Sequence, residues 1–185
     1  MRTCEGGTVQ QYNLLVACPR DRERAARSEI QYFVGDLIGD DGLRVFNTHI
    51  SGLLACRTTM DPFEVVHRLR EFADENPYQF RFAIKFTPLE RCVPSDIESI
   101  KNAAAELKGR IREEQTFRIT VRTRHTELKG MDIINETAPL IPRTVNLDNP
   151  DWTVWIEVVG EWSGVSILVP ERDILSIMTM RGDMY

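Results

Sequence analysis

The sequence has no hydrophobic run long enough to cross a membrane. No apolar stretch approaches the ~18 residues that a membrane-spanning helix needs. The N-terminal segment, MRTCEGGTVQQ, also lacks the apolar core of a signal peptide. The sequence therefore predicts a cytoplasmic protein with no membrane partner.

Cysteines are few and widely spaced. The chain has 4 cysteines and 3 histidines, and no two cysteines form a C-x-x-C pair. A structural zinc site needs about four ligands, usually arranged in close pairs. Asp148 and Asp151 could offer oxygen ligands, but the glutamate that closes an EF-hand-type loop is missing. We expect no metal site. We expect the thiols to be reduced and mostly buried (Cys4, Cys18, Cys56 and Cys92).

Motifs that mark catalytic sites are also missing. The sequence contains no G-x-G-x-x-G, P-loop, G-x-S-x-G or H-E-x-x-H pattern. Neighbouring carboxylates such as Glu113 and Glu114 lie near the predicted ends of elements, where a solvated surface is the ordinary state. Acid–base catalysis instead requires facing carboxyls held in different environments. The residues give no argument for an enzyme or for a cofactor.

Charge is distributed unevenly along the chain. The net charge is −5, which by itself speaks against a nucleic-acid partner. Residues 80–145, however, carry 12 basic and 9 acidic side chains, whereas residues 146–185 carry 2 basic and 7 acidic ones. Residues 80–145 therefore form the only basic segment, between an N-terminal and a C-terminal segment that are both acidic.

Residues 12–88 are predicted to form six elements in the order β-α-β-β-α-β. The predicted strands are 12–18, 43–49, 53–58 and 80–86, and the predicted helices follow Asp21 and Asp61. Asp61-Pro62-Phe63-Glu64 has the form of a capping box with proline at the first helical position. This order is typical of the ferredoxin-like fold, an antiparallel sheet with both helices on one face. Such a widely reused fold says little about function by itself.

A second unit, of α/β type, is predicted to follow. Ser95 and Glu98 suggest another capping box, and the predicted strands and helices are 117–124, 131–141, 144–147, 153–159, 164–169 and 172–181. No flexible linker separates the two units, so we expect them to pack together. The predicted domains are an N-terminal ferredoxin-like domain at 1–90 and a C-terminal α/β domain at 91–185.

The strongest polar signal lies in the strand from Phe117 to Arg124. Successive strand side chains alternate between faces, so the apolar residues point inward and the arginines share the opposite face (Arg118, Arg122 and Arg124). No acidic residue lies between Phe117 and His125. A row of guanidinium groups without counter-charges suits a phosphate backbone. The alternative is an exposed strand face that charge keeps soluble.

The segment RTVNLDNPDWTVWIEVVG, at 143–160, joins a turn-forming run to a strand-like alternation. Its tryptophans, Trp152 and Trp155, are three residues apart and must point to opposite faces of a strand. We expect Trp155 to be packed and Trp152 to lie nearer the surface.

Two stretches of the second unit carry a family resemblance. They are FRITVRTRHTELKGMDIINETAPLI at 117–141 and VNLDNPDWTVWIEVVGEWSGVSIL at 145–168. Their F-x-[IV]-x-[VL]-x-x-R strand and V-N-L-x-N-P-D turn resemble the THUMP domain, a tRNA-binding module found in many RNA-modification enzymes. THUMP domains usually follow a ferredoxin-like domain, so the resemblance extends over nearly the whole chain.

Most THUMP modules are joined to a catalytic domain, such as a methyltransferase or a 4-thiouridine synthetase. The chain ends about 17 residues after Val169, so we expect no such domain here. The sequence is then similar to the stand-alone THUMP adaptor of tRNA cytidine acetylation. That resemblance implies a non-catalytic protein that presents tRNA to a separate RNA cytidine acetyltransferase. In that family both domains recognise the tRNA acceptor end, including the 3′ CCA.

The resemblance and the basic pattern together give a set of candidate RNA-binding residues. These are Lys85, Arg91, Arg118, Arg122, Arg124, Lys129, Arg143, Asn146 and Asn149. Two alternative functions remain open: an RNA-binding subunit of another tRNA modifier such as a methyltransferase, and a ferredoxin-like regulatory module that binds a small molecule.

Overall fold

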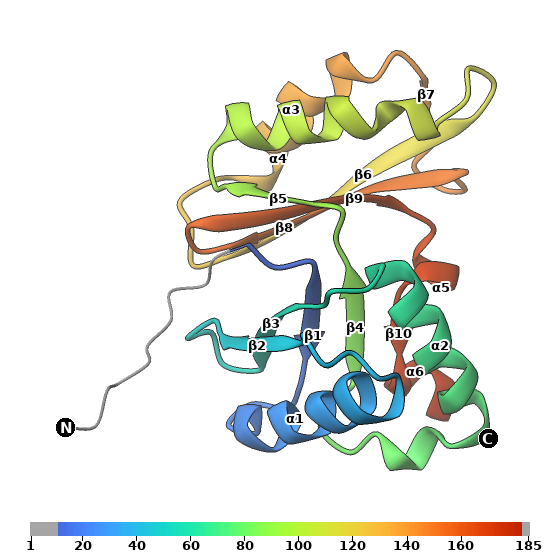
Figure 1. Ribbon diagram of the computed structural model, residues 1–185. Coiled ribbons are helices and arrows are strands. Elements are labelled where there is room, and N and C mark those ends of the chain that lie inside the picture. The colour runs from blue at the N-terminus through green and yellow to red at the C-terminus, as the bar shows by residue number, and fades with distance from the viewer. Residues whose placement is uncertain (1–10, 183–185) are drawn as a thin grey trace.

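The computed structural model describes residues 11–182. Two five-stranded sheets with flanking helices form a mixed α/β fold (Figure 1). The first sheet has the order β10-β4-β1-β3-β2, and all its pairs are antiparallel. Its strands are β1 (Leu14–Ala17), β2 (Arg44–Asn47), β3 (Leu53–Arg57), β4 (Lys85–Pro88) and β10 (Leu175–Ser176). The first four of these strands, with two intervening helical segments, confirm the predicted ferredoxin-like order.

Helical segments pack their apolar sides against this sheet. They are α1 (Glu23–Ile30), which continues into a π-helix, η1 (Gln31–Leu37), and α2 (Pro62–Glu75), which is followed by a 3₁₀ turn, η2 (Pro77–Gln79). Helix α2 begins as predicted, because the Asp61 carboxylate accepts hydrogen bonds from the backbone N–H groups of Phe63 and Glu64.

The second sheet has the order β5-β9-β8-β6-β7. Its strands are β5 (Arg91–Pro94), β6 (Thr116–Arg124), β7 (Thr144–Val145), β8 (Trp152–Val159) and β9 (Trp162–Leu168). Strand β6 runs parallel to both of its neighbours, and the other pairs are antiparallel. Helices α3 (Ile97–Leu107) and α4 (Gly130–Thr137) cover one face, and each ends in a 3₁₀ turn, η3 (Lys108–Arg110) and η4 (Ala138–Leu140).

The C-terminal segment returns from the second sheet to the first. The predicted helix at 172–181 was wrong: the structure has α5 (Pro170–Asp173), then β10, then α6 (Ile177–Gly182). Strand β10 pairs with Lys85 and Phe86 of β4. Residues 175–182 therefore pack with the first sheet, whereas the predicted C-terminal domain comprised all of 91–185.

Strand β4 starts later than predicted, at Lys85 instead of Phe80. The Glu29 carboxylate accepts hydrogen bonds from the backbone N–H groups of residues 81, 82 and 83. This side chain thus binds backbone groups that a strand would have paired with its neighbour.

Two helix starts also differ from the prediction. The cap of α3 is Asp96, whose carboxylate accepts a hydrogen bond from the Ser99 N–H at 2.7 Å. Ser95 instead shares a hydrogen bond with the Ser163 hydroxyl at 2.8 Å. Asp21 does not cap α1, since it lies in the left-handed region with φ of 60°.

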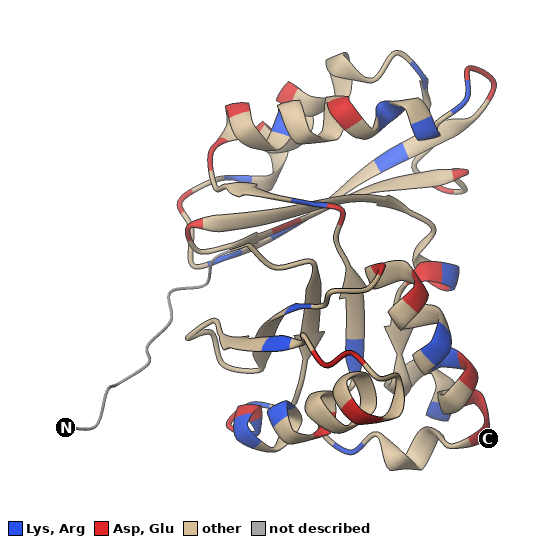
Figure 2. Ribbon diagram, viewed as in Figure 1, with Lys and Arg blue, Asp and Glu red and all other residues tan. Residues whose placement is uncertain are grey.

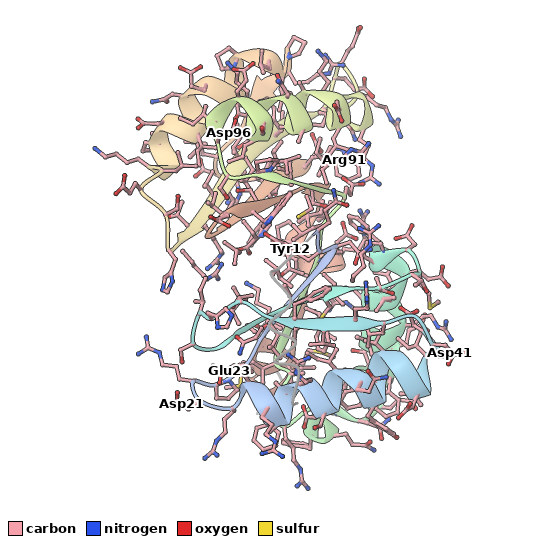
Figure 3. The ribbon with its side chains drawn as sticks, turned by 60° about the vertical axis from the view of Figure 1, so that its left-hand side comes forward. Tyr12, Asp21, Glu23, Asp41, Arg91 and Asp96 are labelled. Carbon is pink, nitrogen blue, oxygen red and sulfur yellow. The ribbon has the colours of Figure 1, made fainter. Side chains whose placement is uncertain are left out.

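A third cluster of buried side chains lies between the two units, in addition to the core of each. We call it the interface core (Tyr12, Leu15, Leu53, Ala55, Leu89, Trp155, Val159, Leu168 and Ile174). Tyr12 lies at this junction in Figure 3, and its hydroxyl donates a hydrogen bond to the Trp162 carbonyl at 3.1 Å. Buried apolar contacts and a hydrogen bond therefore hold the units in one relative orientation.

The described cysteines are free thiols. Cys18 and Cys56 are buried and Cys92 is half-buried, whereas Cys4 lies outside the described residues. Among the helices of residues 11–182, none combines the length and the apolar character needed to cross a membrane.

Candidate nucleic-acid interface

The arginines of β6 lie on the face of the second sheet that α3 and α4 leave uncovered. Phe117 is buried in the core beneath those helices, with Ile119 and Val121 packed against it. The parallel register places Arg122 opposite Glu157. Because side chains alternate along a strand, the arginine row faces away from the helices, as the sequence predicted.

The two tryptophans of β8 point to opposite faces, as predicted. Trp152 is half-buried against the core of the second unit, and its Nε1 donates a hydrogen bond to Gln115 Oε1 at 3.0 Å. Trp155 is 5% exposed and belongs to the interface core, on the side of the arginine row.

Trp155 is the point where cations from the two units meet. The Arg122 guanidinium carbon lies 5.3 Å from the ring centroid, and Lys85 Nζ, from the first unit, lies 5.4 Å from it. Both contacts fall within cation–π range. Burial, followed by repulsion from Arg122, lowers the pKa of Lys85.

A buried carboxylate from the neighbouring strand joins this group. Glu157 is 3% exposed, and its Oε2 lies 2.5 Å from Arg124 Nη1. Its Oε1 accepts a hydrogen bond from Trp155 Nε1 at 2.9 Å. The expectation that the arginine row has no counter-charge was therefore wrong, because the counter-charge comes from β8 and not from β6. We call Lys85, Arg122, Arg124, Trp155 and Glu157 the Trp155 cluster.

Arg118 lies on the same face, nearer the start of β6. Its Nη1 is 3.4 Å from the Leu147 carbonyl oxygen, so it reaches the turn that precedes β8. Its Nε has no hydrogen-bond partner among the described residues. That nitrogen is buried, so only the terminal guanidinium nitrogens of Arg118 could meet a ligand.

Three other predicted basic residues lie apart from the Trp155 cluster. Arg91 points to the helical face, where its Nε is 3.4 Å from Glu106 Oε2 of α3 (Figure 3). Arg143 precedes β7, and its Nε donates to the Ile111 carbonyl at 2.8 Å. Lys129 is exposed immediately before α4. Of the predicted basic residues, the structure therefore brings together Arg122, Arg124 and Lys85, and Arg118 lies further along the same face.

The predicted turn residues have unequal roles. Asn146 Oδ1 accepts from the backbone N–H groups of Asp148 and Asn149, at 3.1 and 3.0 Å, and its Nδ2 donates to the Asn149 carbonyl. Asp151 ties the turn to the start of β6 through the N–H and hydroxyl of Thr116. Asn146 is thus engaged within the turn, while the side chain of Asn149 is exposed.

A hollow of about 530 Å³ adjoins the cluster at the junction of the units. Lys85 and Trp155 line it together with Ser176 and Thr179 of the C-terminal segment and Arg70 of α2. Arg70 is not among the residues predicted from the sequence, because its hydrogen-bond partner, the Ile174 carbonyl at 2.5 Å, lies 104 residues away.

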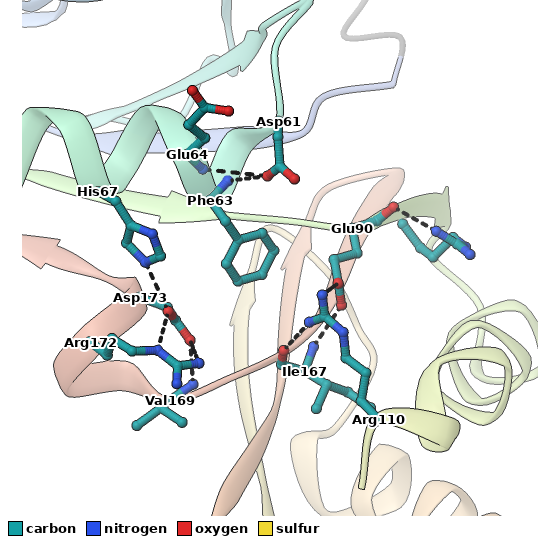
Figure 4. Close-up of polar contacts among 11 residues, drawn as sticks. Asp61, Phe63, Glu64, His67, Glu90, Arg110, Ile167, Val169, Arg172 and Asp173 are labelled. Carbon is teal, nitrogen blue, oxygen red and sulfur yellow. Dashed lines mark hydrogen bonds and ion pairs between the residues drawn. The ribbon is translucent and has the colours of Figure 1, made fainter.

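Hydrogen bonds fix the C-terminal segment beside this hollow (Figure 4). The Asp173 carboxylate contacts His67 Nε2 of α2 at 3.0 Å, the Arg172 guanidinium at 2.8 Å and the Val169 N–H at 2.8 Å. Burial acts to raise the pKa of Asp173, but the hydrogen bonds from these groups outweigh it, so the pKa lies below its usual value.

Figure 2 shows lysine and arginine spread over both units and interleaved with acidic residues. The interface is therefore a local cluster on an acidic protein and not a uniformly basic surface. Within the described part of the chain, no group of three or more His, Cys, Asp or Glu residues is arranged to hold a metal ion.

Comparison with known families identifies the second unit. Residues 94–168 match the family model of the THUMP domain. The second unit is a THUMP domain. The arginine face of β6 lies within the matched residues. No curated protein matches the chain in sequence.

Solved structures share the fold of both units. PH1313 from Pyrococcus horikoshii matches with a TM-score of 0.64 and 16% identity, covering 90% of this chain and 55% of that one. A 4-thiouridine synthetase, solved with RNA and bound ATP, gives 0.58 and 15% over 90% of this chain and 42% of that one. TrmN from Thermus thermophilus gives 0.51 and 14%, over 83% and 44%. The chain spans about half the length of the structures it matches.

Proposed function

We propose that this THUMP-domain protein binds tRNA without catalysing a reaction and presents it to a modifying enzyme. The observation that carries the proposal is the Trp155 cluster, where Lys85 of the first unit meets Arg122 and Arg124 of the THUMP domain. The 4-thiouridine synthetase structure, which has a similar fold and contains RNA, supports an RNA ligand.

The cluster suits phosphate recognition. Arg122 is exposed, and Arg124 keeps 30% of its side chain exposed while one nitrogen contacts Glu157. A guanidinium carries five N–H donors, so Arg124 retains donors for a phosphate oxygen. Arg118 lies further along the same face and extends the contact toward the turn.

The remaining candidate residues would contact RNA outside this cluster. Lys129 and Asn149 are exposed beyond the two ends of β6, and Arg143 lies beside its start. Arg91 faces the helical side, so it would contribute only if the RNA extends around the edge of the sheet. Asn146 would act by shaping the turn that presents Asn149.

The part of the tRNA that we propose to be bound is the acceptor end with its 3′ CCA. Single-stranded ends offer bases, phosphates and 2′-hydroxyls to side chains. The hollow beside Lys85 is lined by cationic, hydroxyl and apolar side chains and by one acidic residue, Glu171, and its cations and hydroxyls suit such a segment. The partner enzyme that we propose is an RNA cytidine acetyltransferase that forms N4-acetylcytidine, and a tRNA methyltransferase is the second candidate.

A gel-shift titration at two salt concentrations tests the proposal. Intact tRNA should bind more tightly than tRNA lacking its 3′ CCA, and equal binding to both would remove the acceptor-end assignment. Arg122→Ala/Arg124→Ala should weaken binding and reduce the slope of log K against log salt by about 1.5, since each lost phosphate contact contributes roughly 0.7 to 0.9.

The matched control is Arg24→Ala/Arg68→Ala, which removes two exposed arginines from helices α1 and α2. It changes the net charge equally but leaves the Trp155 cluster intact. The control should bind tRNA nearly as the unmodified protein does. If the two double variants behave alike, binding depends on overall charge and the cluster is not the site.

A further inference from the structure

The Glu157 carboxylate is placed where an RNA-binding surface would ordinarily exclude a negative charge. It is buried on the arginine face of β8, and each of its oxygens has a different partner. Oε2 contacts Arg124 Nη1 at 2.5 Å, and Oε1 accepts the indole N–H of Trp155 at 2.9 Å. A carboxylate here repels phosphate, so its presence requires a reason beyond charge balance.

Packing closes the β9 side of the Glu157 carboxylate. Glu157 of β8 lies opposite Gly164 of the neighbouring strand β9. A Cβ atom at Gly164 would lie 2.3 Å from Leu89 Cδ1. Leu89 of the interface core therefore fills the space on the β9 side. On the β6 side, the carboxylate contacts the Arg124 guanidinium, whose side chain is partly exposed.

The bonds made by Glu157 reach each cation of the cluster, either directly or through the Trp155 ring. One bond holds the Arg124 guanidinium directly. The other fixes the Trp155 ring, against which Arg122 and Lys85 both lie. We propose that Glu157 is the positioning residue of the RNA-binding surface, holding these cations in the arrangement that phosphates meet. This inference rests on the proposed function.

Glutamine at this position separates positioning from charge. Glu157→Gln keeps the shape, removes the charge and leaves one carbonyl oxygen to serve two donors. Positioning predicts tRNA binding weaker by about tenfold, the equivalent of one charge-assisted hydrogen bond. A simple counter-charge predicts the opposite, because removing a negative charge beside phosphates should tighten binding.

Glu161→Gln provides the matched control. Glu161 is exposed in the turn between β8 and β9, and its replacement raises the net charge by the same amount. It should leave tRNA binding unchanged or slightly tighter. Weaker binding by Glu157→Gln alone supports the inference; binding by Glu157→Gln that equals or exceeds that of the unmodified protein overturns it.

A second variant covers the case in which Glu157→Gln fails to fold. Glu157→Asp keeps the charge but shortens the side chain by one methylene. If Glu157 positions the cations, this variant should bind tRNA more weakly. If Glu157 is only a counter-charge, its tRNA binding should be unchanged. Melting curves of each variant show whether lost binding reflects unfolding. If the unmodified protein does not bind tRNA, the proposed function and this inference both fall; if it binds and the folded aspartate variant binds equally, only the inference does.

Discussion

Replacing Arg124 by alanine should cost much more stability than replacing its neighbour Arg122. Arg124→Ala leaves the Glu157 carboxylate, 3% exposed, without its ion-pair partner. Breaking a fully buried ion pair costs about 3–5 kcal/mol. Because the Arg124 side chain is 30% exposed, solvent screens part of the interaction, and we expect about 2–3 kcal/mol. Arg122 loses only its contact with the Trp155 ring, about 0.5–1 kcal/mol.

Thermal unfolding followed by circular dichroism measures the difference. For a chain of this size, 1 kcal/mol shifts Tm by about 2–4 °C, so Arg124→Ala should lower Tm by about 5–10 °C and Arg122→Ala by about 1–4 °C. Adding Glu157→Gln to Arg124→Ala should recover most of the loss, because no buried charge remains. Equal, small losses in the two single variants would refute the reasoning, since Glu157 would then be adequately solvated without Arg124.

Three further substitutions test other parts of the structure. Burial lowers the pKa of Lys85, so the folded state disfavours its charged form at every pH below the folded pKa. Lys85→Met removes this penalty together with the contact to the Trp155 ring, so the free energy of unfolding should change by less than about 1 kcal/mol near neutral pH, while tRNA binding in a filter assay should weaken. The pKa of Asp173 lies below its ordinary value of 3.8, so its carboxylate stabilises the fold above that pH and the benefit is lost as pH falls below it. Asp173→Asn should accordingly lower Tm near pH 7, and the difference in Tm should narrow as the pH falls below 3.8; a Tm difference independent of pH would contradict this assignment. Asn146→Ala removes three hydrogen bonds of the turn and should cost about 1–2 kcal/mol in urea unfolding, whereas Asn149→Ala, which leaves its backbone contacts in place, should be nearly neutral.

Local patterns predicted much of the fold. The Asp61 cap, the alternation along β6 and the opposite orientations of Trp152 and Trp155 depend on residues within one element, so the sequence determines them. The order of the first six elements also follows from local periodicity. Strand β10 was not predicted, because a strand of two residues is too short to show an alternation of apolar and polar side chains. Its pairing with β4 is also a long-range contact.

The candidate site was harder to predict than the fold, because its geometry depends on neighbouring strands. The charge pattern of β6 identified Arg122 and Arg124 but could not show that Glu157, 33 residues beyond Arg124, supplies a counter-charge. Arg91 looked like part of the same surface because it lies at the junction of the units in sequence. Its strand places it on the other face of the sheet. Arg70 gave no signal, since its partner belongs to the C-terminal segment.

The return of the chain into the first sheet makes the THUMP domain an insertion within the ferredoxin-like unit. The chain crosses between the units twice, once between β4 and β5 and once between β9 and β10. Two covalent connections restrict the rotation of one unit relative to the other, whereas a single connection would act as a hinge. A ligand that touches both Lys85 and the β6 arginines therefore meets surfaces that are already oriented. Little of the binding free energy is then needed to fix the relative orientation of the two units.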